Sequence, residues 1–188
     1  MASSTIDRPR VGISRCLLGD EVRYDGGHRR DAFLVDVLSR ELEWVPVCPE
    51  VEVGMGTPRE PIHLVAAAHG GVPAGSHQVR LLGVTSERDW TDAFESWAAT
   101  RVRDLAAMDL SGFVLKAGSP SCGIDAVPVS GAAASTAEGR GLFAQALMKA
   151  LPDLPIEDER RLAVPAARDA FLARVFARHR SRPVESRA

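Results

Sequence analysis

Short apolar runs alternate with amphipathic stretches along most of the chain. Apolar runs bounded by charged or turn residues predict strands at residues 11–15, 43–48, 79–84 and 112–116. Apolar positions at helical spacing predict helices over residues 30–42, 91–108, 139–151 and 165–180, with Thr91 as a cap of the second. Strands that alternate with helices indicate a single α/β domain with a mainly parallel sheet flanked by helices.

Two segments interrupt this pattern. Residues 68–78 are rich in glycine, and residues 130–141 are small and polar. Both are long for plain connectors, so we expect functional loops there. The tail after Arg180 lacks an apolar pattern, and we expect it to be disordered.

Composition and charge narrow the class of protein. The 188 residues are 45% hydrophobic, which is enough for a sizeable core, and the formal net charge is −2. That balance gives no overall attraction to nucleic acid or to anionic membranes. No apolar run reaches the length of a membrane span, and the N-terminal residues lack the apolar core of a secretory signal. The sequence therefore predicts a cytoplasmic protein without a membrane partner.

The three cysteines occupy similar positions. Cys16 and Cys48 each close a predicted strand, and Cys122 lies in the Gly- and Ser-rich loop after a third. Parallel strands place their carboxyl ends at one edge of the sheet, so we expect the three thiols to meet there. They are separated by 32 and 74 residues, which excludes a local zinc-knuckle pattern. An odd number of cysteines also does not fit a pure disulfide framework.

Several kinds of thiol site fit this placement. The thiols could be buried core residues, or a nucleophile with a resolving partner. They could hold zinc together with a histidine, for which His28 is the candidate. They could also hold a 4Fe–4S cluster, for which three protein ligands would leave one iron open as a Lewis acid that binds a soft atom such as sulfur.

Three segments that contain these cysteines resemble the signature blocks of the TudS family, the 2-thiouracil desulfidases. They are "SRCLLGDEVRYDGGHRRD" (14–31), "VPVCPEVEVGMGTPREP" (45–61) and "FVLKAGSPSCG" (113–123). Two later segments, 139–162 and 168–180, are similar to the family as well. The likeness implies one desulfidase domain over residues 9–180, with flexible termini at 1–8 and 181–188.

The resemblance also implies a cofactor and a reaction. In the family the matching cysteines hold a 4Fe–4S cluster whose fourth iron has no protein ligand and takes the sulfur of a thiocarbonyl. Here these positions are Cys16, Cys48 and Cys122. Glu50 and Ser119 match a glutamate and a serine of the family; we interpret Glu50 as the general base for water and Ser119 as a hydrogen-bond or proton donor.

The expected activity is desulfidation of a thiolated pyrimidine, with 2-thiouracil as the substrate and sulfide as a product, by a hydrolase or lyase. Tyr24, Ser121 and Arg59 are weaker candidates for substrate binding, and Arg23, Arg29 and Arg30 could steer an anionic substrate. A solvated loop explains the same arginines equally well. Alternative functions are desulfidation of thiouridine in nucleosides or tRNA, and a non-catalytic iron–sulfur or thiol sensor. The family often has arginine where this chain has Gly118, which bears on the choice of substrate.

Overall fold

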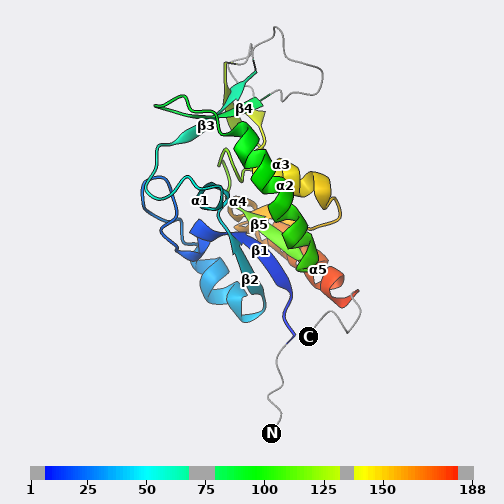
Figure 1. Cartoon of the computed structure of the whole chain (residues 1–188). Helices are drawn as coiled ribbons and strands as arrows, with labels where there is room; N and C mark the ends of the chain where they lie inside the picture. The colour runs from blue at the N-terminus through cyan, green and yellow to red at the C-terminus, as the bar shows by residue number, and fades with distance from the viewer. Residues whose placement is uncertain (1–6, 68–78, 132–137, 182–188) are drawn as a thin grey trace.

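Two four-stranded sheets form the framework of the protein (Figure 1). The computed structural model describes residues 7–67, 79–131 and 138–181. Sheet A is parallel throughout, in the order β2-β1-β5-β8, and consists of β1 (Arg10–Ser14), β2 (Glu43–Val47), β5 (Gly112–Leu115) and β8 (Ile156–Asp158). Sheet B is mixed, in the order β4-β3-β6-β7, and consists of β3 (Ile62–Ala66), β4 (Val79–Gly83), β6 (Val127–Ser130) and β7 (Glu138–Gly139). The predicted α/β class with a mainly parallel sheet is confirmed.

Helical segments cover both faces of sheet A (Figure 1). One face packs against α2 (Thr91–Ala107) and α3 (Leu142–Ala150), and the other against η2 (Phe33–Val37), η3 (Leu38–Arg40) and α5 (Pro165–Arg180). Short helical turns complete the chain: η1 (Arg15–Leu18), α1 (Pro49–Glu52) and α4 (Glu159–Leu162). Successive side chains of a pleated strand point to opposite faces of the sheet. In β5, Phe113 and Leu115 therefore belong to one core and Val114 to the other.

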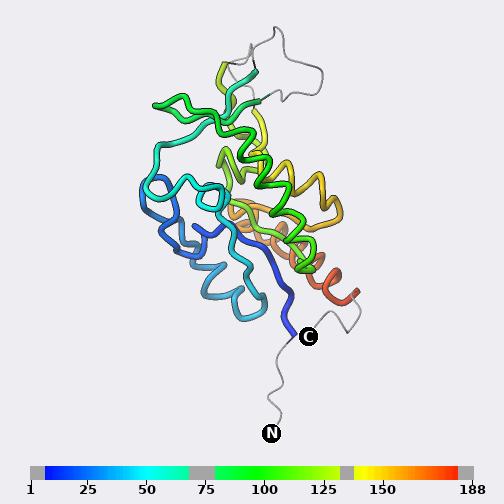
Figure 2. Tube along the Cα trace, in the orientation of Figure 1, coloured from blue at the N-terminus to red at the C-terminus, as the bar shows by residue number. Residues whose placement is uncertain are grey.

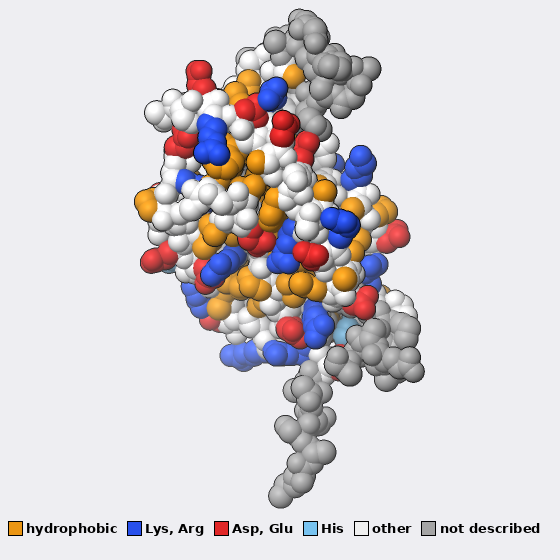
Figure 3. Space-filling view, in the orientation of Figure 1, with side chains coloured by type: hydrophobic (Ala, Val, Ile, Leu, Met, Phe, Trp, Pro, Cys, Tyr) orange, Lys and Arg blue, Asp and Glu red, His pale blue; other side chains and the backbone are white. Residues whose placement is uncertain are grey.

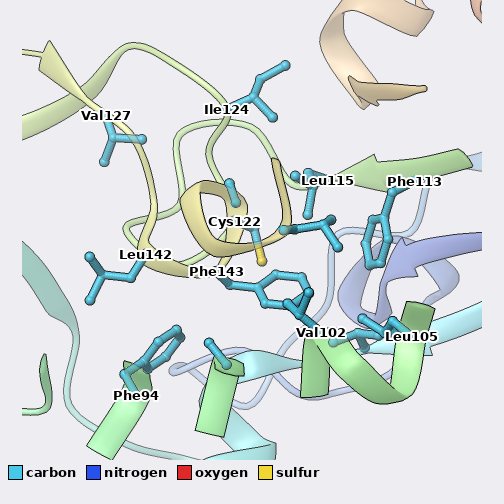
Figure 4. Packing of buried hydrophobic residues seen from close by; sticks show 14 of the residues in the cluster. Phe94, Val102, Leu105, Phe113, Leu115, Cys122, Ile124, Val127, Leu142 and Phe143 are labelled. Carbon is cyan, nitrogen blue, oxygen red and sulfur yellow. The ribbon is translucent and has the colours of Figure 1, made fainter. Parts of the chain in front are cut away.

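The larger core is built around aromatic side chains (Figure 4). The Phe143 ring lies 5.7 Å from that of Phe113 and 5.5 Å from that of Trp97, centroid to centroid. Phe94 stands edge-on to Trp97 at 5.5 Å. Burial of each such side chain contributes roughly 1.5–3 kcal/mol, so α2 and α3 are fixed firmly against sheet A.

The predicted helix over residues 30–42 is wrong in its detail. The segment forms a π-helical turn followed by a 3-10 turn, which Figure 2 traces in light blue. Leu34 and Leu38 in this segment are buried, whereas Val37 is 44% exposed. The hydroxyl of Ser39 donates to the carbonyl of Leu34 and accepts from the indole nitrogen of Trp44, so it competes with regular helical hydrogen bonds.

Other boundaries differ less. The first helical residue of α3 is Leu142 rather than residue 139, because residues 138–139 pair with β6 as strand β7. Thr91 is the first residue of α2 and not its cap; its hydroxyl accepts from the backbone N–H of Leu81. The predicted loop at 68–78, and residues 132–137 of that at 130–141, lie outside the described residues, as does the tail from residue 182.

The order of the strands creates a crevice at one place in sheet A. The chain leaves β1 to form β2 on one side and leaves β5 to form β8 on the other, although β1 and β5 are neighbours. In open parallel sheets, such a reversal leaves a binding crevice beyond the carboxyl ends of the two strands. The residues that follow β1, β5 and the adjacent β2 are therefore placed to form a site.

Candidate functional site

All three cysteines line one cavity of about 310 Å³ at the carboxyl edge of sheet A. Cys16 lies in η1 directly after β1, Cys48 comes just before α1 at the end of β2, and Cys122 lies in the loop after β5. This volume is at the lower end of the range for small-molecule sites. The sequence-based expectation that the thiols share one edge of the sheet thus agrees with where the structure places them.

Backbone hydrogen bonds fix the loop that carries Cys122. The hydroxyl of Ser119 accepts from the backbone N–H groups of Ser121, at 3.2 Å, and Cys122, at 3.1 Å. The carbonyl of Ser121 accepts from the first turn of α3, at 3.0 Å from the nitrogen of Phe143. A Cβ at Gly141 would lie 2.5 Å from the Ser121 backbone, so only glycine lets α3 approach this loop. The tight packing holds Cys122 against the core residues seen in Figure 4. The same residue also lines the cavity.

A hydrogen bond joins the ends of β1 and β5 at the cavity, and a partly buried ion pair connects the end of β5 to α4. The backbone N–H of Lys116 donates to the hydroxyl of Ser14 at 2.9 Å. The ammonium group of Lys116 lies 2.5 Å from Glu159 Oε1 and 3.0 Å from the carbonyl of Ala117. The other oxygen of Glu159 accepts from the backbone N–H of Ala117 at 2.8 Å. Glu159 therefore fixes a cation on the cavity wall.

Sequence reasoning missed both members of this pair. Lys116 directly precedes the Gly- and Ser-rich loop, which was the available signal that it borders the site. Glu159 is 43 residues away in the chain, in α4, and nothing in its local sequence connects it to the cysteines.

Burial keeps the free thiols protonated. It raises the pKa of Cys16 to about 11, with a further increase from Cys48 and opposing effects of Lys116 and Arg23. Burial likewise raises the pKa of Cys48 and, more strongly, that of Cys122. Cys16 and Cys48 also raise the pKa of Cys122, as Cys48 does that of Cys16, because the three sulfur atoms share one cavity. Thiolates in such a place need a compensating positive charge, which bound iron supplies.

The donor set fits a cluster better than a single ion. Within residues 7–67, 79–131 and 138–181, no three Cys, His, Asp or Glu side chains converge closely enough to hold one metal ion. In a 4Fe–4S cluster each thiolate binds a different iron, so its ligands stand further apart. His28 is not part of the cavity wall, and its Nδ1 accepts from the backbone of Arg30 at 3.2 Å. The zinc alternative with His28 as fourth ligand therefore has no geometric support.

Glu50 reaches the cavity from the first turn of α1, and both of its carboxylate oxygens have partners. Oε1 accepts from the hydroxyl of Ser121 at 2.9 Å. Oε2 accepts from the guanidinium of Arg59, at 2.9 Å from Nε and at a shorter distance from Nη2. The carboxylate is thus held in one orientation at the wall that the cysteines share.

The remaining predicted site residues are placed as follows. Ser119 and Arg59 line the cavity, and Tyr24 lines it while 39% exposed, with the guanidinium of Arg23 5.2 Å from its ring centroid. Ser121 is fully buried behind Glu50 and is not part of the wall. Gly118 lines the cavity with φ +67°, and a Cβ there would meet nothing within 4 Å.

Comparison with known families agrees with this geometry. The profile of the family described as 2-thiouracil desulfurase matches residues 11–159, which include all three cysteines, Glu50 and Glu159. The chain belongs to this family.

Similar proteins support the assignment to the desulfurase family. A solved structure of the 4Fe–4S-dependent thiouracil desulfidase TudS superposes with a TM-score of 0.63 at 27% identity, over 88% of this chain and 99% of that one. The uncharacterized protein YbbK of Bacillus subtilis (strain 168) is 32% identical over 111 residues, which is 59% of this chain and 71% of YbbK. The matching family is thus one of enzymes described as 2-thiouracil desulfurases, and the solved neighbour TudS is described as dependent on a 4Fe–4S cluster.

A second hollow is lined by Glu52, Trp97, Thr100, Arg101 and Asp104, and no cysteine belongs to its wall. Acidic and basic side chains are interspersed over the face seen in Figure 3. Among the described residues, no helix has both the length and the apolar character needed to cross a membrane. The cavity at the edge of sheet A is therefore the place to look for the chemistry.

Proposed function

We propose that this protein replaces the thiocarbonyl sulfur of a thiolated pyrimidine by oxygen, with 2-thiouracil as the first substrate to test. The observation that carries the proposal is the meeting of three thiols, two of them buried, and a fixed carboxylate on one cavity. In the overall reaction, the oxygen of one water molecule forms the new C=O bond. The C=S bond breaks, and the sulfur leaves as hydrogen sulfide with the two protons of that water.

The thiolates of Cys16, Cys48 and Cys122 would hold the cluster. When bound, a 4Fe–4S cluster with three protein ligands supplies an open iron, a Lewis acid for the thiocarbonyl sulfur. Glu50 would orient the attacking water and accept its proton, because its carboxylate is fixed at the cavity wall. Ser119 would donate its hydroxyl hydrogen to the substrate, since that oxygen already accepts two backbone hydrogen bonds.

A thiolated nucleoside is the second candidate substrate. The observation in its favour is the open space at Gly118, where no side chain limits the cavity. Arg23 and Arg29 also line the wall, and Tyr24 offers a partly exposed ring on which a base could stack. Comparison of kcat/KM for 2-thiouracil, 4-thiouracil and the corresponding nucleosides decides between the two substrate sizes.

The test begins with anaerobic purification or reconstitution. We expect about four iron atoms and four acid-labile sulfides per chain, and formation of one carbonyl product per sulfide released. An enzyme that binds the cluster but turns over neither the base nor the nucleoside would overturn the desulfidase proposal in favour of a sensor. Zinc in place of iron would overturn the assignment of the cofactor.

A further inference from the structure

Arg59 is a cation on the cavity wall that has no donor left for a substrate. Its side chain is only 6% exposed. Besides the two contacts to Glu50 Oε2, Nη2 donates to the carbonyl of Val22 at 2.9 Å. Nη1 donates to the carbonyl of Gly56 at 2.7 Å and to the hydroxyl of Thr57 at 3.3 Å. A guanidinium has five N–H groups, and these contacts engage all of them.

The contacts of Arg59 extend through Glu50 to both of the later cysteine loops. Glu50 is two residues after Cys48, and the Ser121 hydroxyl that meets its other oxygen belongs to the residue just before Cys122. The hydrogen-bonded side chains of Arg59, Glu50 and Ser121 therefore connect α1 to the loop after β5. A change at Arg59 or Ser121 alters the placement of the Glu50 carboxylate between them.

Val22 gives Arg59 a second connection to the site. The thiol of Cys48 also lies within reach of the Val22 carbonyl, at 3.8 Å, and the backbone N–H of Arg59 donates to the carbonyl of Tyr24 at 2.9 Å. A thiolate has no hydrogen to donate, so once Cys48 acts as a ligand Arg59 remains the donor to that carbonyl. Arg59 thus supports the segment of residues 22–24 on the cavity wall in either state.

We propose that Arg59 is a positioning residue that acts through Glu50 and does not contact the substrate. Two donors of Arg59 hold Oε2 of Glu50, and the Ser121 hydroxyl holds Oε1, so the carboxylate is fixed at the cavity from both of its oxygens. The kinetic part of this inference rests on the proposed desulfidase function; the structural part does not.

The kinetic test is a double-mutant cycle in the cluster-loaded enzyme. We expect Arg59→Met to lower kcat by roughly 10–100-fold and to change KM by less than about threefold. Arg59→Lys keeps the charge but has a single donor nitrogen, so it restores part of kcat. In the Glu50→Gln background, Arg59→Met costs less than about threefold, because both changes remove the same interaction. A raised KM with unchanged kcat, or fully additive losses, would show direct substrate binding or an independent role.

A second measurement does not depend on activity. Amide hydrogen exchange reports local opening, and it can be followed in loaded and metal-free protein. We expect Arg59→Met to accelerate exchange at residues 48–52 and 119–123 together, and the Glu50→Gln/Arg59→Met double variant to add nothing further. The matched control is Arg101→Met, which breaks the contact of another arginine with a glutamate of α1, 3.0 Å from Glu52. Its effect should not reach residues 119–123.

These two measurements separate the possible failures. If the wild-type enzyme has no desulfidase activity while exchange in both loops responds as expected, the proposed function is wrong and the positioning role stands. If exchange rises only around residues 56–59, the positioning role is wrong whatever the activity. Should Arg59→Met fail to fold, both measurements are made on Arg59→Lys instead. Wild-type kcat and wild-type exchange in Arg59→Lys would show that the two-donor contact to Glu50 is not required.

Discussion

Sheets A and B share one hydrophobic core but differ in what they contribute at their edges. Phe113 and Leu115 of sheet A and Leu64 and Leu81 of sheet B are completely buried in the same cluster. Sheet A is parallel throughout, and the residues that follow three of its strands carry the cysteines. Sheet B is mixed, and among the described residues of its strands only Ile62, at the start of β3, belongs to the wall of the cavity.

The difference shows why chemistry gathers at one sheet. Parallel strands direct their carboxyl ends to the same side, so residues from distant parts of the chain converge there. In sheet B, β4 and β7 run against their neighbours, and its strand ends are divided between two edges. We therefore expect changes at the carboxyl edge of sheet A to affect cofactor and turnover, and changes in sheet B to affect stability alone.

The largest effect is expected from the cysteines. Replacement of Cys16, Cys48 or Cys122 by serine removes a thiolate that iron requires, so iron, acid-labile sulfide and activity should fall together in each variant. Iron per chain, the visible absorption spectrum and turnover are measured after identical anaerobic reconstitution. Val129→Ala in β6 is the control from sheet B and should retain all three. Full iron content in two of the three cysteine variants would contradict the ligand assignment.

Two glutamates ten residues apart sharpen the comparison further. Glu50 and Glu60 each accept a hydrogen bond from a serine hydroxyl, but only Glu50 lines the cavity. We expect Glu50→Gln to keep the cluster and to lower kcat by at least about 10²-fold, the usual scale for a lost general base. Glu60→Gln should leave kcat unchanged. Similar kcat values for the two variants would remove Glu50 from the chemistry.

These expectations also show which features local sequence could predict. Residues 11–15 and 112–116 are short apolar runs; the observed β1 is shifted from the first by one residue at each end, and β5 ends one residue before the second. Cys16, Cys48 and Cys122 follow such runs, so their meeting could be inferred from parallel topology. Pro46 fits β2 because that strand is at the edge of sheet A, where a missing N–H is tolerated.

Long-range pairing could not be predicted in this way. Strand β8 has three residues, two of them acidic, and no local pattern distinguishes it from a loop. Strand β3 pairs in parallel with β6, more than 60 residues further on, and Glu159 reaches Lys116 from 43 residues away. Such contacts depend on how complete elements pack, and the hydrophobic period of a short segment does not contain that information.

Removal of core volume from sheet B gives a smaller and different effect. Leu81 is completely buried in β4, so Leu81→Ala should lower the free energy of unfolding by about 2–5 kcal/mol through lost contacts and a cavity. Iron per chain and kcat of the folded fraction should stay at wild-type values. Val84→Ala, at a position that is 50% exposed, serves as the control, and its effect should stay within about 0.5 kcal/mol. Loss of iron from folded Leu81→Ala protein would contradict the separation of the two sheets.

The smallest effect concerns the pH dependence of stability near sheet B. The hydroxyl of Ser86 and the backbone N–H groups of Ser86 and Thr85 donate to Glu60, and they lower the pKa of its carboxyl from the ordinary value of 4.5. A carboxyl whose pKa is lower in the folded state stabilises the fold above its ordinary pKa. That stabilisation disappears as the pH falls through the folded value.

Glu60→Gln should therefore lower the melting temperature slightly at about pH 7, and the difference from wild type should shrink steadily below pH 4.5. Ser86→Ala keeps the Glu60 carboxyl but removes the largest cause of its lowered pKa. The melting temperature of Ser86→Ala should therefore lie closer to that of Glu60→Gln at about pH 7 than the wild-type value does. Melting temperatures of the three proteins, measured together across the acid range, give the comparison. A Glu60→Gln difference that stays constant down to about pH 3 would mean that these hydrogen bonds do not favour the charged carboxylate. The acid sensitivity of the fold would then have to come from other carboxylates.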